Sequence, residues 1–566
     1  MNAKFSLFTT KAPGYRIYIL IAIPIVLFNL IVVFGLRVLI ADDASVYCQM
    51  IKGLDVFMIS KFIHLAIGRI ILGTSFYIMR LSLEIVRGIY VLFLMVPISC
   101  LFYHLLHKKM GIPKIAAYTA AVLPNILPGQ HLIPAYINGS QVLVGMIAVL
   151  CCFFAIFRYL DAQSPKSWKM LITAVLLYLI ATQLDDQPVF SFPVLIFAIL
   201  GYHKLNRKHI FLAASLCLVF LHKSAWMLFM TRDFTVITTP TIQKSSSRLG
   251  ILFSSMLPLP DFLKESKELL AMIFIVIVIT AFIFYIREKD KGFDLLKPFA
   301  HLSHKKFIFY IYGFLLAWIV SNIFVFITIA PKFTIRYGYI TSYGINTLLV
   351  ISLYPILKKI FHKKNKILYL TFAILIIISG ISRFVELKER FNKVIYNYAL
   401  IKEHLNKFKF PGDSQIVLYY FEIDAKIFRG TLAHSSGHLK FMLKRNDIDG
   451  LIGWKKNQYF NFYNPFDVKK RGPMQGIDIN RPVFLFIEEN KKFKQYEYAF
   501  QWKEKAGKSE WTIFNFDKKT GKASSLSTGN EIDNYFSALK RIKKKGITQK
   551  DILWGGQASK KDLERL

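Results

Sequence analysis

The chain has 566 residues, of which 54% are hydrophobic and 19% are charged, and its mean hydropathy is +0.41. Soluble domains carry about a quarter charged residues, so this composition excludes an ordinary soluble protein and indicates a membrane protein. The 73 Lys and Arg exceed the 35 Asp and Glu, for a net charge of +38. Basic loops that orient membrane helices and contact anionic lipid headgroups account for such an excess, so we expect no nucleic acid partner.

Cysteine usage excludes two further classes of site. The spacing of the cysteines fits no metal-ligand motif, and the polar C-terminal part has none, so neither a disulfide framework nor a zinc site is predicted. The five are Cys48, Cys100, Cys151, Cys152 and Cys217.

Apolar runs of about 20 residues, long enough to cross a bilayer, recur through the first two thirds of the chain. We therefore expect a polytopic α-helical membrane protein with about 11 transmembrane helices. The first run is long and has no small-residue cleavage site, which favours a retained helix over a removed signal peptide. The predicted spans are 17–40, 88–107, 113–127, 141–160, 170–184, 188–203, 209–230, 269–286, 307–329, 338–357 and 367–383.

The loops between these spans fall into two sets that differ in charge. One set has roughly three times the density of Lys and Arg of the other, and the positive-inside rule places it in the cytoplasm. The N-terminus is then cytoplasmic, and eleven spans leave the C-terminal part outside; a count wrong by one would put it inside. The Lys-, Ile-, Phe- and Asn-rich composition is typical of an AT-rich bacterial genome, so the predicted location is a bacterial inner (plasma) membrane. The basic loops are 1–16, 104–114, 158–169, 202–209, 287–306 and 358–367.

The composition changes sharply after Arg383. Residues 1–383 are predicted to form a multi-span transmembrane domain whose first outer loop, 41–86, carries amphipathic helices. Residues 384–566 are predicted to form a soluble, basic extracytoplasmic domain of α/β or α+β type, because a helical pattern over 384–409 precedes short β-type runs. These runs are 415–421, 481–489, 496–502 and 511–516.

Two pairs of adjacent carboxylates lie at predicted outer ends of spans. Asp42 and Asp43 follow the first span, and Asp185 and Asp186 occupy a very short later loop. Either pair can serve as a helix cap, and Asp186 with Pro188 resembles a helix start. A carboxylate pair at the bilayer surface can instead accept a proton or hold a divalent cation. One capped helix does not explain two pairs on one face of the membrane, which favours a functional role.

The remaining outer loops add a histidine and several cations. His131 lies in a loop without Lys, Arg, Asp or Glu, and it can line a site or simply form a loop hydrogen bond. Arg248 lies in the fourth outer loop, and Lys332 with Arg336–Tyr337 lies in the fifth. Arginine can bind a phosphate through two parallel hydrogen bonds, and lysine adds a point charge. Arg336 can equally extend to lipid headgroups.

The order of these features resembles the GT-C superfamily of polytopic glycosyltransferases, which use polyprenyl-phosphate-linked sugars. The resemblance rests on ADDASVY after the first span, LDDQP in a short outer loop, IRYGY before the last spans, and PGDSQIVLYY leading into an outer domain. It covers nearly the whole chain through short motifs. It implies an inverting glycosyltransferase that acts on the outer face of the membrane and transfers a hexosyl or pentosyl group.

The resemblance also implies roles for the outer-loop residues. Asp43, with Asp42 beside it, would be the catalytic base or would orient the acceptor. A second group would bind acceptor, sugar or metal, and a third would bind the donor phosphate. A divalent cation (Mg²⁺ or Mn²⁺) bound by the two Asp pairs is left open, because some members use one. The second group is Asp185, Asp186 and His131, and the third is Arg336, Lys332, Arg248 and Tyr337.

Two other functions fit a polytopic chain. An O-antigen polymerase or ligase also uses a lipid phosphate, but such proteins have no large soluble C-terminal domain. A lipid or glycan transporter (flippase) predicts charges inside the spans and repeated halves. Here the main charged exception inside a span is His222–Lys223, and no internal repeat is found. The partners expected of a glycosyltransferase are a polyprenyl-phosphate sugar donor, a cell-envelope glycan, glycolipid or protein acceptor, and membrane lipids.

Overall fold

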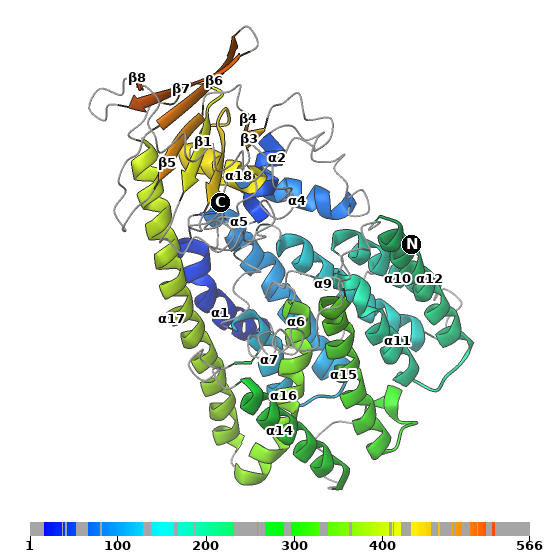
Figure 1. Cartoon of the computed structure of the whole chain (residues 1–566). Helices are drawn as coiled ribbons and strands as arrows, with labels where there is room; N and C mark the ends of the chain where they lie inside the picture. Colours follow the sequence, from blue (N-terminus) through cyan, green and yellow to red (C-terminus); the bar gives the residue numbers. More distant parts are fainter. Residues whose placement is uncertain are drawn as a thin grey trace. The chain divides into compact units, whose positions relative to one another are not determined.

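The structure is a computed structural model of the whole chain (Figure 1). It describes residues 16–36, 38–39, 42–51, 66–79, 82–127, 135, 137, 139–162, 168–185, 187–230, 257–258, 267–287, 296–328, 338–361, 365–406, 410, 412–419, 432–453, 462–463, 477–478, 483–487, 498–505, 508–516 and 523–526.

The chain divides into two compact units. The first comprises Met1–Leu36 and Lys61–Glu389, and the second comprises Arg37–Ser60 and Arg390–Leu566. The division at 389/390 lies six residues beyond the predicted domain boundary. The segment that opens the first predicted outer loop belongs to the second unit, so the acidic pair at its start belongs to the same unit as the C-terminal strands.

The first unit is a bundle of helices. α5, η3, α6 and η4 follow one another without a break, and so do α7 and η5, and η8 and α11. The bounds are α1 (Arg16–Leu30), η1 (Ile31–Gly35), α4 (Ala66–Met79), α5 (Leu83–Ile89), η3 (Tyr90–Met95), α6 (Val96–His104), η4 (Leu105–Lys109), α7 (Lys114–Val122), η5 (Leu123–Asn125), α9 (Gly139–Asp161), α10 (Trp168–Leu184), η8 (Gln187–Ser191), α11 (Phe192–Gly201), α12 (Arg207–Met230), α14 (Lys267–Arg287), η11 (Lys297–Phe299), α15 (His304–Thr328) and α16 (Gly338–Phe361).

A helix lies over each of the eleven predicted spans. Within the described residues, seven helices are long and apolar enough to cross a membrane, and two shorter apolar helices, 168–184 and 187–201, accompany them. The number of crossings therefore stays a prediction. Large apolar side chains such as Ile273, Val276 and Ile279 of α14 are exposed, and contiguous apolar surface of this kind needs a lipid rather than an aqueous environment. The seven are Arg16–Gly35, Leu83–Lys109, Gly139–Asp161, Arg207–Ala225, Leu270–Arg287, Gly338–Phe361 and Asn365–Glu403.

Small residues and aromatic rings bring the central helices together. Gly344 of α16 packs on α15, where an added Cβ would lie 2.9 Å from Ile319 Cγ1. The adjacent Trp318 donates its indole N–H to the Ile340 carbonyl at 2.8 Å and stacks on Phe153 of α9, with ring centroids 5.9 Å apart. Small residues allow such close approach in membrane bundles, where burial of apolar surface no longer drives packing.

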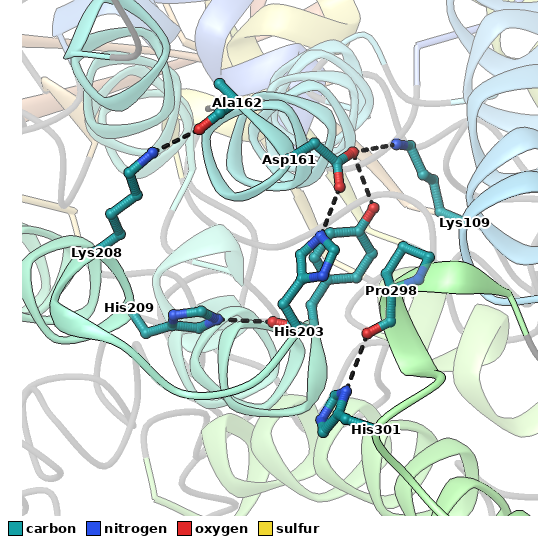
Figure 2. A network of polar contacts seen from close by, with 9 residues as sticks. Lys109, Asp161, Ala162, His203, Lys208, His209, Pro298 and His301 are labelled. Atoms are coloured by element: carbon teal, nitrogen blue, oxygen red, sulfur yellow. Dashed lines mark hydrogen bonds and ion pairs between the residues drawn. The ribbon is translucent and has the colours of Figure 1, made fainter. Parts of the chain in front are cut away.

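One end of this bundle is held by a network around the Asp161 carboxylate, which closes α9 (Figure 2). Asp161 accepts hydrogen bonds from Lys109 Nζ at 3.2 Å and from the Tyr202 hydroxyl at 3.0 Å, and His203 Nε2 lies 2.8 Å from its other oxygen. These partners offset the unfavourable placement of a carboxylate at a helix C-terminus. The His203 backbone N–H also donates to the Pro298 carbonyl at 3.0 Å.

This network bears on the grouping of the loops. Its members come from four of the loops predicted to lie together on the basic side: 104–114, 158–169, 202–209 and 287–306. The density of Lys and Arg in the loops and the contacts of the Asp161 network therefore group the same helix ends. That this end faces the cytoplasm stays a prediction.

A second set of buried polar contacts gathers helix ends from the opposite set of loops. Arg87 of α5 donates its Nε–H to the Ala135 carbonyl at 3.2 Å and a terminal N–H to the Leu36 carbonyl. Tyr90 donates to the Ile137 carbonyl at 3.0 Å. The end of the first span, the start of the second and the residues before α9 thus meet, as expected of the loops predicted on the outer side.

α17 (Asn365–Asn406) is a single 42-residue helix, and it joins the predicted span 367–383 to the predicted amphipathic helix 384–409 without a break. Leu387, Phe391, Tyr398, Ile401 and Leu405 are buried, so the amphipathic pattern identified most of the packed face. Phe384, which the same pattern included, is exposed.

The second unit contains α2 (Asp42–Ile51), α18 (Leu432–Leu443) and a six-stranded sheet of order β2-β1-β5-β6-β7-β8. β1 pairs in parallel with β2 and β5, whereas β5, β6, β7 and β8 pair antiparallel in succession. α18 is the crossover between β1 and β2, as parallel neighbours require. Strands lie at all four predicted β-type runs. The bounds are β1 (Gln415–Tyr419), β2 (Asp449–Gly453), β5 (Val483–Ile487), β6 (Tyr498–Lys505), β7 (Lys508–Phe516) and β8 (Ala523–Leu526), with a separate pair β3 (Phe462–Tyr463) and β4 (Ile477–Asp478).

Candidate functional site

The first acidic pair opens α2. Asp42 is the first residue of this helix and Asp43 the second, so both residues belong to the first turn, where the helix dipole favours negative charge. The pair therefore lies at the start of a helix, as one of the two interpretations predicted. A helix start does not explain why the Asp43 side chain is fully buried. Carboxylates are almost never fully buried unless they are paired, so the surroundings of Asp43 must supply it with polar contacts.

α18 forms one wall of that environment. Its Gly437 lies against the backbone of Ala44, the residue after Asp43, and one turn later the rings of Tyr47 and Phe441 meet edge to face with centroids 5.7 Å apart. Cys48, on the same helix as Asp43, is buried as well. The structure thus brings the beginning of the first predicted outer loop together with a helix almost 400 residues later in the chain.

The second acidic pair lies in the first unit. Asp185 Oδ1 accepts the backbone N–H of Gln187 at 2.9 Å and starts η8, and Asp185 is half-buried. The capping role foreseen for this pair is therefore filled by Asp185, whereas the sequence pattern pointed to Asp186. This contact fixes the carboxylate at the helix start.

Two polar side chains of η8 add to this region and were not anticipated. Gln187 and Ser191 are buried, and neither the Gln187 amide nor the Ser191 hydroxyl has a hydrogen-bond partner among the described residues. Their signal in the sequence is weak, because a single Gln and a single Ser beside an apolar helix are common. They add two buried polar side chains to η8, which begins two residues after Asp185.

A third group of buried polar residues joins the helices of the first unit. The Asn125 amide donates to Ser99 Oγ at 2.6 Å and to the Tyr343 hydroxyl at 2.9 Å, and it accepts from the Tyr339 hydroxyl at 2.6 Å. All four side chains are fully buried or nearly so. Asn125 therefore connects η5, α6 and α16.

Arg383 extends this group to α1 and α17. Its guanidinium is fully buried and donates to the Leu127 carbonyl at 2.7 Å and to Asn29 Oδ1 at 2.5 Å. A buried arginine inside a membrane segment is costly, and it is a functional-site candidate by default. The sequence contained the signal, since Arg383 closes the last apolar run, but the change of composition at that point indicates a domain boundary equally well.

The other predicted site residues lie outside the described residues. They are Asp186, His131, Arg248, Lys332, Arg336 and Tyr337. The donor-phosphate site predicted from four of them stays a prediction. Among the residues that the structure describes, no group of three or more His, Cys, Asp or Glu side chains could hold a metal ion, so the cation bound by the two Asp pairs also stays a prediction. Asp43 and Asp185 belong to different units.

No protein-family model matches the chain, and no curated protein matches it. Among solved structures, the chain is similar to an archaeal oligosaccharyltransferase, AglB from Archaeoglobus fulgidus, in complex with an inhibitory peptide and a dolichol-phosphate. That similarity has a TM-score of 0.38 and 12% identity, and it covers 83% of this chain and 69% of AglB. The chain is also similar to ArnT from Cupriavidus metallidurans bound to undecaprenyl phosphate, with a TM-score of 0.45, 8% identity, and coverage of 84% of this chain and 93% of ArnT.

One of these structures holds a dolichol-phosphate and the other holds undecaprenyl phosphate. With both TM-scores below 0.5, neither substrate nor site carries over from them to this chain.

Proposed function

We propose that this protein is an inverting membrane glycosyltransferase. It transfers a sugar from a polyprenyl-phosphate-linked donor to a glycan, glycolipid or protein acceptor of the cell envelope, on the outer face of the inner membrane. The observation that carries the proposal is the full burial of Asp43 in the first turn of α2, at the predicted outer membrane surface. Burial is one way in which proteins adjust a carboxylate for proton transfer.

The reaction assigned to the site balances without an oxidant or reductant. The acceptor oxygen attacks the anomeric carbon, its proton passes to Asp43, and the bond from the anomeric carbon to the phosphate oxygen breaks. The polyprenyl phosphate leaves with the bonding electron pair. Negative charge grows on the departing phosphate, so the reaction needs cations beside it. Lys332, Arg336 and Arg248, with the Tyr337 hydroxyl, are proposed for this task.

The other acidic residues are proposed to bind sugar or acceptor. Asp185 accepts the backbone N–H of Gln187 at the start of η8, and this contact would hold its carboxylate in one orientation for sugar binding. Asp186 and His131 belong to the same proposed group. Asp42 neighbours the base and adds negative charge to the same helix start.

A lipid or glycan transporter is the second candidate. Lys223, in the second half of the apolar helix α12, is buried, and a buried charge within a span is what a transport pathway predicts. A polymerase or ligase acting on lipid-linked glycans is the third, but the second unit, with its six-stranded sheet, has no counterpart in that class.

The decisive experiment compares surface glycans by mass spectrometry in cells that lack the protein, cells that contain it, and cells that contain Asp43→Asn. A defined sugar should be absent from the first and third samples. The matched control is Asp413→Asn, because Asp413 is exposed in a turn at φ 60°, a backbone conformation that asparagine accepts. The control should restore the sugar.

Two results would count against the proposal. Glycans that are identical in all samples would contradict the proposed glycosyl transfer and favour the transporter. A sugar that is lost in the deletion but restored fully by Asp43→Asn would keep a role in glycan synthesis and move the base elsewhere. The level and thermal stability of each variant in the membrane separate loss of chemistry from loss of protein.

A further inference from the structure

The backbone of η8 is fixed on three sides. Its first N–H donates to Asp185 Oδ1 at 2.9 Å, and the Val189 carbonyl accepts the hydroxyl of the buried Tyr178 of α10 at 2.7 Å. Between these two contacts, Pro188 packs on α9, where a Cβ built on Gly145 would lie 2.8 Å from Pro188 Cγ. The direction in which each η8 side chain leaves the backbone is therefore set before any ligand binds.

Residues from three predicted outer loops meet beside this helix. A Cβ built on Gly68 of α4 would lie 2.3 Å from the Leu184 carbonyl oxygen and 2.8 Å from Gln141 Nε2. Gly68 belongs to the first predicted outer loop, and Leu184 ends α10 directly before the second acidic pair. Gln141 follows the loop of His131 at the start of α9. η8 therefore lies at the end of the bundle where a substrate on the outer face would be bound.

The side-chain amide of Gln187 is the unusual feature of this helix. Gln187 is 3% exposed, and neither its Oε1 nor its Nε2 has a hydrogen-bond partner among the described residues. Buried amides normally bond to the protein or to ordered water, because burial otherwise loses the hydrogen bonds that solvent would supply. A methionine has nearly the same length and no such requirement, so stability does not explain an amide here. Residues that break the local rules of stability are expected at functional sites.

Phe190 lies on the same side of η8 as Gln187. η8 is a 3-10 helix over Gln187–Ser191, and side chains three residues apart eclipse one another in such a helix. By the same spacing, Ser191 lies on the side of Pro188, which packs on α9. Phe190 is half-buried, whereas the other four residues of η8 are buried. The side of η8 that solvent reaches thus carries an aromatic ring next to a neutral amide.

An aromatic ring beside an amide suits a neutral sugar. An amide has an acceptor oxygen and a donor nitrogen, and a hydroxyl can both donate and accept. Gln187 Oε1 can therefore accept from one sugar hydroxyl while Nε2 donates to the neighbouring one, and the Phe190 ring can pack against the C–H groups of the sugar ring. Ligand sites commonly combine aromatic surface with a few such polar groups. Neither side chain carries a charge, so neither suits the phosphate of a lipid-linked donor.

We propose that Gln187 and Phe190 form a sugar-binding subsite, in which the amide bonds to two neighbouring hydroxyls and the ring packs against the sugar. No described residue bonds the amide in place, so turning it toward the half-buried ring costs no hydrogen bond. The subsite deepens the proposed function, because it adds an uncharged recognition element to the loop of Asp185, and it rests on that function for the origin of the sugar. The sugar belongs either to the donor or to the acceptor, and the transfer experiment distinguishes the two.

The first test needs no substrate. Thermal unfolding of the full-length protein in detergent is compared for the wild type, Gln187→Met and Thr182→Val. Thr182 is the matched control, because its buried hydroxyl donates to the Leu179 carbonyl at 2.8 Å and so has a partner. Loss of the unpartnered amide should raise the unfolding temperature by about 1–4 °C, whereas loss of the partnered hydroxyl should lower it. A lower unfolding temperature for Gln187→Met would mean that the protein itself bonds the amide, and it would overturn the subsite.

The second test measures the binding of sugars directly. The unfolding temperatures of the wild type, Gln187→Met and Phe190→Leu are measured with and without neutral monosaccharides, both hexoses and pentoses, each at about 100 mM. Sugars are excluded from protein surfaces and stabilise folded proteins in general, so the measured quantity is the difference between the wild-type shift and the variant shift. With a dissociation constant of about 10 mM, one sugar should shift the wild type by about 2–4 °C more than either variant. Equal shifts of the three proteins with every sugar would overturn the subsite.

The third test uses transfer, with the sugar that the comparison of surface glycans identifies. Gln187→Met should raise KM about 10-fold or more for the substrate that carries the recognised sugar, with KM for the other substrate within about twofold. A raised KM for the lipid-linked donor assigns the recognised sugar to the donor, and a raised KM for the acceptor assigns it to the acceptor. Thr182→Val should keep both wild-type KM values. Gln187→Met values equal to those of the wild type would overturn the subsite.

Failure of the subsite and failure of the proposed function give different results. A monosaccharide that stabilises the wild type but not Gln187→Met, without any detectable glycosyl transfer, would keep the subsite and overturn the glycosyltransferase. Transfer that depends on Asp43 but proceeds normally in Gln187→Met would keep the glycosyltransferase and overturn the subsite.

Discussion

Gly437 of α18 and Ala44 of α2 touch through their backbones: a Cβ on Gly437 would lie 1.7 Å from the Ala44 carbonyl oxygen and 2.4 Å from its carbonyl carbon. Backbone atoms cannot move aside as a flexible side chain can. Even the smallest substitution at position 437, to alanine, would therefore displace the helix that carries Asp43.

Gly437→Ala should lower both stability and transfer. Overpacking a closed contact costs about 1–3 kcal/mol, and the displaced helix should carry Asp43 away from its acceptor. The control is Gly88→Ala, because no atom lies within 4 Å of a Cβ built there and alanine favours the helix by about 0.5–1 kcal/mol. Thermal unfolding and glycan mass spectrometry measure the two effects; a Gly437→Ala protein as stable and active as the Gly88→Ala protein would show that the contact is not tight.

Substitutions of Asp185 should separate its structural contact from its proposed binding role. Asparagine caps a helix as well as aspartate does, whereas alanine loses the cap at a cost of about 0.5–2 kcal/mol. Asp185→Asn should therefore unfold like the wild type but transfer poorly, and Asp185→Ala should lose stability as well. Full transfer by the Asp185→Asn protein would mean that Asp185 caps the helix and has no binding role.

Asn125→Ala should destabilise the first unit by about 1–3 kcal/mol, because it leaves the buried Ser99, Tyr339 and Tyr343 hydroxyls without the amide that they contact. Thr119→Val is the control nearby in the same stretch of chain. The Thr119 hydroxyl is buried with no hydrogen-bond partner among the described residues, so its removal should be neutral or stabilising. Unfolding in detergent compares the two; equal losses would mean that the Asn125 network adds little.

Cysteine labelling should test the predicted orientation. In a background without the five native cysteines, Lys204→Cys lies at the end of the bundle that Figure 2 shows, and Asp413→Cys lies in the second unit. Both side chains are exposed, so a membrane-impermeant thiol reagent should reach Asp413→Cys in intact spheroplasts and Lys204→Cys after permeabilisation. The reverse pattern would invert the orientation, and labelling of both in intact cells would mean an even number of spans between residues 204 and 413.

The pair of Arg445 and Asp447 predicts a small pH dependence of stability. The hydrogen bonds from the Arg445 guanidinium, one of them 3.0 Å from Nε to Oδ1, hold the pKa of Asp447 below its ordinary value. A lowered folded-state pKa contributes stability that is present above the unfolded value, about 3.9, and lost as pH falls through the folded value. Asp447→Asn should be less stable than the wild type at pH 7, by under about 1 kcal/mol because the pair is exposed, and the difference should shrink below pH about 4. A difference that is constant from pH 7 to pH 3 would contradict this.

Much of the helical architecture could be predicted because apolar runs and basic loops are strong, local signals. Helices lie over all the predicted spans, and strands lie over 415–421, 481–489, 496–502 and 511–516. The helix after Arg383 was predicted as a separate element, but no Pro or Gly interrupts residues 381–406, so one helix continues through the change in composition.

The candidate site was harder to predict because its contacts join distant parts of the chain. The Asp43 pattern marked a candidate, but nothing near it in the sequence pointed to α18, since Gly437 is an ordinary residue of a short helix. Arg383 stands out in the sequence as a charge at the end of an apolar run. Nothing in the sequence distinguishes its partner Asn29, which lies within the first apolar run. Short motifs indicate which residues carry chemistry, and only the fold shows what surrounds them.

Arg383 and Asn29 are 354 positions apart, and their hydrogen bond connects the last predicted span to the first. At 5–20 residues per second, about 20–70 s of synthesis separate the two residues. During that interval the amide oxygen of Asn29 lacks the Arg383 donor. Completion of this bundle is thus tied to the synthesis of α17, and a chain that ends before residue 383 would lack the donor to the Asn29 amide oxygen.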